Sequence, residues 1–112
     1  MTREEMFAYA LTQLGAEDST LHGGRCIRVR GHWIITESSE KGVPALALDH
    51  GDVEFLMETE PQTYFQTPHF RGYPPVLVRT EAADDARLRD QIDKAWARRA
   101  TRAQRKARGL EA

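Results

Sequence analysis

The sequence predicts an α+β fold in which one antiparallel sheet carries helices on one face. Apolar residues recur at helical spacing near both ends of the chain, whereas between Gly23 and Asp49 they recur at every second residue. The predicted order is helix, three strands, short helix, two strands and long helix. Such an order is typical of a two-layer α+β domain. A chain of 112 residues is long enough for one such domain.

The first predicted element is a helix over residues 2–14. Thr2 and Glu5 have the spacing of a capping box, and Gly15 is suited to end the helix. The predicted inner face contains Phe7, Ala10, Leu11 and Leu14, and the predicted solvated face contains Arg3, Glu4 and Gln13.

Three short strands, RCIRVR, HWIITE and ALALD, are expected to form a meander. If the first turn spans residues 30–32, Trp33 and Ile35 join Ile27 and Val29 on the inner face. A two-residue turn would instead send Ile34 inward. We prefer the three-residue turn because it buries the indole.

The second half predicts a short helix, two strands and a long helix. HGDVEFLMETEP gives the short helix, and TYFQT and VLVRT give the strands. Thr80 or Asp84 can cap the last helix, whose inner stripe is Leu88, Ile92, Ala95 and Trp96. Because this stripe is absent beyond Arg98, we expect the helix to fray there. We therefore expect one domain over residues 1–97 and a basic tail over 98–112.

Charge is distributed unevenly along the chain, although the net charge is only −1. Residues 1–93 carry nine basic and sixteen acidic groups, whereas seven cations and no acid lie between Lys94 and Arg108. The N-terminal segment is acidic and amphipathic, unlike a secretory signal, and no apolar run is long enough to span a bilayer. These features predict a soluble cytoplasmic protein with an acidic body and a basic tail.

The segment TYFQTPHFRGYPPVLVRT, residues 63–80, followed by IDKAWARRA, resembles the C-terminal half of the MmcQ/YjbR family. The start, MTREEMFAYALTQLGAED, resembles the beginning of that family. The resemblance spans nearly the whole chain, and residues 65–79 are its most specific part. It implies a fold like that of CyaY, the bacterial frataxin, and a DNA-binding role through a double-wing motif. It implies no catalytic residues.

Two interpretations of residues 63–80 remain open. Pro68, Pro74 and Pro75 stiffen the segment and Gly72 permits a turn. The segment could therefore present a binding platform of His69, Phe70, Arg71 and Tyr73. Alternatively, the aromatic side chains Tyr64, Phe65, Phe70 and Tyr73 fill a gap between the sheet edge and the last helix, and the prolines protect an edge strand.

Basic residues are the main candidates for a nucleic-acid interface. Arg28 and Arg30 are expected to share the open face of their strand, and the tail could bind phosphates through counterion release. Alternatively, these cations pair with the acids of the body or lie at a solvated helix end. The candidate residues are Arg28, Arg30, His69, Arg71, Tyr73, Arg98, Arg99, Arg102, Arg105, Lys106 and Arg108.

Neither a metal site nor an active site is predicted. The four histidines lack zinc spacing, and the acids of LDHGDVE suit a helix N-terminus better than a metal loop. Iron binding through Glu4 and Glu5 would rest on analogy with frataxin alone. The single cysteine, Cys26, is expected to be packed in a strand. We therefore expect a non-catalytic binding protein without a cofactor, with DNA as the leading partner. The alternative is an adaptor that uses residues 63–80 as a pocket for a small anion or a protein.

Overall fold

A computed structural model of the chain describes residues 1–38, 42–68 and 75–109. It has the predicted α+β class, with one antiparallel sheet of six strands in the order β1-β2-β3-β4-β6-β5. In chain order the elements are α1 (Arg3–Leu11), β1 (Ala16–Leu21), β2 (Gly24–Val29), β3 (His32–Glu37), β4 (Pro44–Leu46), α2 (His50–Thr59), β5 (Tyr64–Phe65), β6 (Val76–Val78), the 3₁₀ turn η2 (Thr80–Ala82), α3 (Asp85–Arg99) and α4 (Arg102–Ala107).

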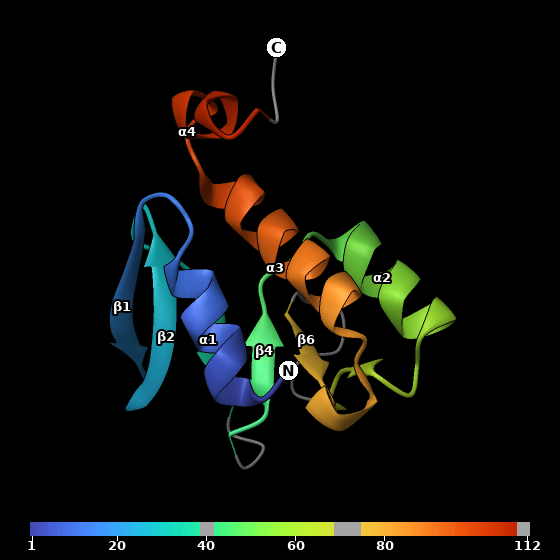
Figure 1. Ribbon diagram of the computed structural model, residues 1–112. Coiled ribbons are helices and arrows are strands. Elements are labelled where there is room, and N and C mark those ends of the chain that lie inside the picture. Colours follow the sequence, from blue (N-terminus) through green and yellow to red (C-terminus); the bar gives the residue numbers. More distant parts are fainter. Residues whose placement is uncertain (39–41, 69–74, 110–112) are drawn as a thin grey trace.

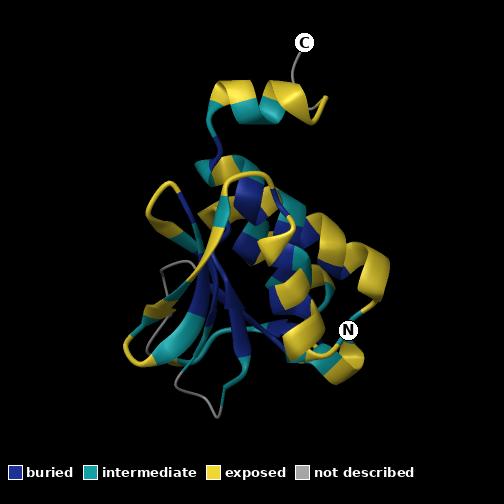
Figure 2. Ribbon diagram, turned by 60° about the vertical axis from the view of Figure 1, so that its left-hand side comes forward, coloured by how far each residue is buried: buried dark blue, intermediate teal, exposed yellow. Residues whose placement is uncertain are grey.

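Helices α1, α2 and α3 cover one face of the sheet (Figure 1). Because side chains alternate along a strand, Ile27, Ile35 and Leu46 all reach this face and enter one core with Phe7 and Ile92. The residues of this core accordingly lie between the sheet and the helices (Figure 2).

A second row of buried residues crosses the opposite face of the sheet. Cys26 pairs with Thr36, Thr36 with Ala45, and Ala45 with Leu77. Paired residues of antiparallel strands share a face, and these four side chains lie between the core residues of each strand. Their exposed fractions are 0%, 6%, 1% and 0%, so the expectation that Cys26 is packed is confirmed.

The first helix begins as predicted but is shorter. Thr2 and Glu5 form the capping box, whereas the helix ends at Leu11. Leu11 and Leu14 are 37% and 46% exposed, which corrects their assignment to the inner face. Gln13, predicted to be solvated, is buried at 7% exposure. The early end of the helix removes Leu14 from the helical spacing on which the prediction depended.

The preference for a three-residue turn before β3 is wrong. Val29 pairs with His32, and the two turn residues Arg30 and Gly31 have φ values of +56° and +81°, as in tight hairpins. An irregularity in the pairing then sends both Ile34 and Ile35 into the core. Because the turn has two residues, Trp33 pairs with Arg28, lies on the opposite face and is only half-buried.

Strand β1 was not predicted, because its sequence AEDSTL is mostly polar, and its residues are half-buried or exposed. The helix α2 and the strands β5 and β6 lie where they were predicted. Asp84 caps α3 as expected. The expected fraying after Arg98 is wrong, because Thr101 caps a further helix, α4. Within the described ranges, no helix combines the length and the apolar character that crossing a membrane requires.

Candidate functional site

A cavity of about 350 Å³ gathers three arginines at the end of the sheet, and we call it the arginine pocket. Its walls come from the β2–β3 hairpin, the residue that follows β4, and the C-terminal end of α3. It is lined by Arg28, Gly31, His32, Trp33, Ala47, Arg98 and Arg99. The fold thus brings together basic residues that are about seventy positions apart in the sequence.

Arg28 is held by neutral groups. Its Nε donates to Ser19 Oγ at 3.2 Å, one terminal nitrogen to Gly31 O at 3.0 Å, and the other to Thr20 O at 3.2 Å. These bonds use three of the five N–H groups of the guanidinium. Since none of these partners carries a charge, Arg28 is oriented without being neutralised.

Arg98 and Arg99 line the pocket from the C-terminal end of α3. Arg98 Nη1 donates to Ala47 O at 3.0 Å. Partial burial lowers the pKa of Arg98, and the adjacent charge of Arg99 lowers it further, whereas Asp49 and Asp52 act in the opposite direction. Arg99 Nε is buried and has no hydrogen-bond partner among the described residues.

The arginine pocket is positively charged. Among the described residues that line it there is no carboxylate. Arg25 shows the contrasting arrangement, because both of its bonds, at 3.1 and 3.0 Å, go to the carboxylate of Asp18. A cavity that fixes guanidinium groups without a carboxylate is chemically suited to an anion with several oxygens.

Three predicted site residues, Arg28, Arg98 and Arg99, therefore meet in one place. Arg30 lies beside them, and its Nη1 donates to Arg99 O at 3.4 Å. It does not share a strand face with Arg28, which corrects the prediction, because Arg30 occupies the hairpin turn. The predicted residues His69, Arg71 and Tyr73 lie outside the described residues.

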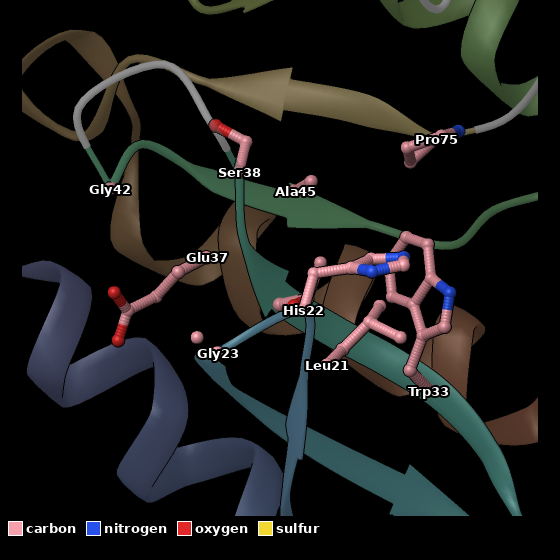
Figure 3. Close-up of a pocket in the computed structure, with 11 residues that line it drawn as sticks. Leu21, His22, Gly23, Trp33, Glu37, Ser38, Gly42, Ala45 and Pro75 are labelled. Carbon is pink, nitrogen blue, oxygen red and sulfur yellow. The ribbon is translucent and has the colours of Figure 1, made fainter.

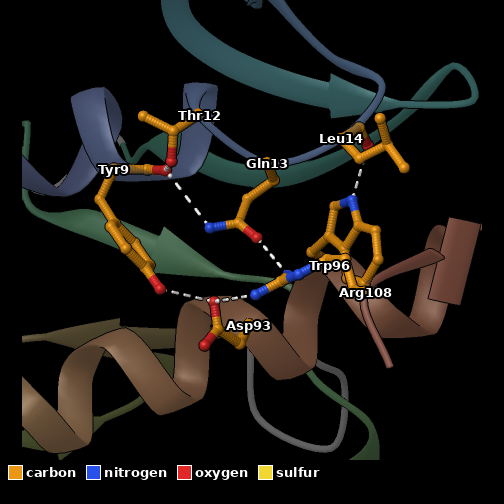
Figure 4. A network of polar contacts seen from close by, with 7 residues as sticks. All are labelled: Tyr9, Thr12, Gln13, Leu14, Asp93, Trp96 and Arg108. Carbon is orange, nitrogen blue, oxygen red and sulfur yellow. Dashed lines mark hydrogen bonds and ion pairs between the residues drawn. The ribbon is translucent and has the colours of Figure 1, made fainter. Parts of the chain in front are cut away.

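Some basic side chains of α4 and of its C-cap residue contact the body of the protein, and others are exposed. Arg105 Nη1 donates to Ala97 O at 3.2 Å and Ala100 O at 2.6 Å. Arg108 bonds Gln13 and lies over the Trp96 ring at 4.5 Å from its centroid (Figure 4). The side chains of Arg105 and Arg108 thus dock α4 on the body. Arg102 and Lys106 are exposed.

A second cavity of about 560 Å³ adjoins the first, and we call it the aromatic pocket (Figure 3). It lies between the β1–β2 turn, strands β3 and β4, and Pro75. Its lining residues are Leu21, His22, Gly23, Gly24, Trp33, Thr36, Glu37, Ser38, Gly42, Ala45 and Pro75. Trp33 lines both cavities. His22, His32 and Trp33 were not predicted as site residues. A two-residue hairpin turn would have placed Trp33 on this face.

The described part of segment 63–80 has structural contacts. Tyr64 is buried in the core, and this burial raises its pKa to about 12. Arg79 lies over the Phe65 ring at 4.0 Å from its centroid, and Gln66 Nε2 donates to Pro75 O at 2.9 Å. These contacts favour the interpretation in which Tyr64 and Phe65 pack between the sheet edge and the last helix. The residues of the alternative binding platform, His69, Phe70, Arg71 and Tyr73, lie outside the described residues. No group of three or more potential metal ligands occurs within the described ranges.

Sequence comparison finds relatives for part of the chain. No family model matches it. Uncharacterized proteins of Mycobacterium bovis and of two Mycobacterium tuberculosis strains are each 46% identical to it over 48 residues. The match covers 43% of this chain and 37% of each relative's length. These matches assign no family, so the resemblance to the MmcQ/YjbR family stays a prediction.

Proposed function

We propose that the protein is a non-catalytic nucleic-acid-binding protein whose arginine pocket binds backbone phosphates. The observation that carries this proposal is the convergence of Arg28, Arg98 and Arg99 in a cavity with no carboxylate among its described lining residues. Phosphate offers several charged oxygens, and a guanidinium can donate two parallel hydrogen bonds to them. The family resemblance, a CyaY-like arrangement of the fold and a cytoplasmic location remain parts of the proposal that rest on the sequence.

The contacts of the basic tail differ from those expected of a flexible arm. Two tail cations, Arg105 and Arg108, contact the body of the protein. We therefore assign the main phosphate contact to the arginine pocket. Arg30 in the adjacent turn and the exposed Arg102 and Lys106 would add long-range attraction.

A second candidate function is the binding of a small anionic ligand, and the size of the aromatic pocket favours it. Its volume of about 560 Å³ lies within the usual range for small-molecule sites, about 300–1,000 Å³. Pro75, which belongs to segment 63–80, lines the aromatic pocket. If the ligand is a small anion, a free nucleotide should bind as tightly as a nucleic-acid polymer does. If the protein binds nucleic acid, the polymer should bind more tightly than the free nucleotide.

Fluorescence anisotropy of labelled DNA at several salt concentrations tests the proposal. The Arg98→Ala, Arg99→Gln double variant is expected to bind more weakly and to reduce the slope of log K against log salt by about 2. Arg89→Ala is the single-charge control, since Arg89 is an exposed residue of the same helix. Equal affinity and an equal slope in wild type and the double variant would refute the assignment of phosphate binding to this pocket.

A further inference from the structure

We propose that the nucleic acid is single-stranded, with an unpaired base stacked on Trp33 in the aromatic pocket and its neighbouring phosphate in the arginine pocket. This inference rests on the proposed function, and it names the form of nucleic acid that the site selects.

The first step is the position of Trp33 between the two cavities. Its partner across the hairpin is Arg28, so the indole and this guanidinium lie on the same face of the sheet. The indole is half-buried, which fixes it in place while leaving part of it accessible. Because Trp33 lines both the cavity of about 560 Å³ and the cavity of about 350 Å³, a ligand on the indole would lie next to the arginines.

The second step is the character of the aromatic pocket. In Figure 3 the imidazole of His22 extends toward the indole of Trp33, whereas the side chain of Glu37 points away from both. His22 has a φ of +51° in a two-residue turn with Gly23, so the hairpin fixes this unusual backbone position. Two rings therefore border a space large enough for a planar ligand. Stacking on such rings tolerates every base, because each base has a π face.

The third step is the difference between single and double strands. In a duplex the bases are paired and stacked, so a base face cannot stack on a protein ring unless the base leaves the helix. An unpaired base can turn out of the strand while its own phosphate remains nearby. Adjacent ring-lined and guanidinium-lined cavities match these two parts of one nucleotide unit. A duplex could use the arginine pocket alone.

Binding of a thymidine oligomer and of a duplex of matched length tests the inference. Trp33→Ala is expected to weaken binding of the single strand at least about 5-fold and to weaken duplex binding much less, because a duplex would contact the guanidinium groups and not stack on the indole. Trp33→Phe, which keeps an aromatic face, is expected to retain most of the affinity. Phe55→Ala is the matched control, because Phe55 is an aromatic residue that is 58% exposed on α2. Thermal unfolding of each variant establishes that it is folded.

Tryptophan fluorescence gives an independent readout on the unmodified protein. The chain has two tryptophans, and Trp96 is fully buried at 0% exposure. Quenching by the oligomer is therefore expected to come from Trp33 and to disappear in Trp33→Phe. Quenching that persists in this variant would contradict stacking on Trp33.

Three results would overturn the inference. Equal affinity of Trp33→Ala and wild type for the single strand would remove Trp33 from the site while leaving phosphate binding intact. Thymidine monophosphate that bound as tightly as the oligomer would make the ligand a free nucleotide. Failure of both DNA forms to bind at low salt would refute the proposed function itself.

Discussion

Replacing Arg108 by alanine is expected to detach helix α4 from the body without unfolding the body. The Arg108 side chain bonds the Gln13 side chain, pairs with Asp93 at 3.6 Å and lies over the Trp96 ring (Figure 4). Gln13 follows α1, and Asp93 and Trp96 belong to α3. The Arg108 side chain thus ties the end of α4 both to the segment that follows α1 and to α3.

The size of the effect follows from these three contacts. A hydrogen bond from a charged donor contributes about 1.5 kcal/mol. The ion pair contributes less than about 1 kcal/mol, since its side chains are 30% and 31% exposed, and the cation–π contact contributes about 0.5–1 kcal/mol. Because coupled contacts do not add fully, the docking of α4 should weaken by about 2 kcal/mol in Arg108→Ala.

Amide hydrogen exchange measures this local opening. A loss of about 2 kcal/mol corresponds to roughly 30-fold faster exchange of the α4 amides, while the amides in the centre of α3 keep their protection. Arg108→Lys should give an intermediate rate, because lysine retains the charge but lacks the flat guanidinium. Lys106→Ala is the control for charge on the same helix. Equal exchange of α4 in wild type and Arg108→Ala would show that the contacts of Arg108 do not dock this helix.

Three further predictions concern the body of the protein. Asp84→Ala removes the cap that accepts from Arg87 N, so it should lower the free energy of unfolding in urea by about 1 kcal/mol; no change would contradict the capping role. Gly31→Ala places a Cβ at a φ of +81° and should cost about 1–2 kcal/mol in the same assay; unchanged stability would argue against the two-residue turn. The hydrogen bonds from Arg25 lower the pKa of Asp18, so this stabilisation is present above about pH 4 and is lost as pH falls through the lowered pKa. In Arg25→Gln an NMR titration should show the Asp18 pKa returning toward its ordinary value. An Asp18 pKa as low in the variant as in wild type would refute the pairing.

Local patterns were sufficient for much of the fold. The capping box at Thr2, the cap at Asp84 and the inner stripe of α3 depend on residues close in sequence, and the structure has all of them. Strand β1 was missed because its polar side chains give no apolar alternation, and it is held by pairing with β2. Helix α4 was missed for a similar reason, since its docking depends in part on the contact of Arg108 with Gln13, which is distant in sequence.

The site was predictable only in part. The sequence indicated that Arg28, Arg98 and Arg99 were candidates, but periodicity cannot show that they meet in one cavity. Their meeting depends on how the end of α3 packs beside the β2–β3 hairpin. The position of Trp33 depends on the length of the turn before β3, because a two-residue turn pairs Trp33 with Arg28 on the face opposite Ile27. Burial of Trp33 was expected because a three-residue turn was preferred.

NMR of the arginine Nε–H groups during titration with DNA tests most directly whether the arginine pocket binds phosphate. Each resonance can be assigned with single arginine-to-lysine variants. We predict that the largest shifts occur at Arg28, Arg98 and Arg99. Arg25, which pairs with Asp18, and Arg89 on the exposed side of α3 should change little. Saturable shifts confined to other arginines, with these three unchanged, would contradict the account.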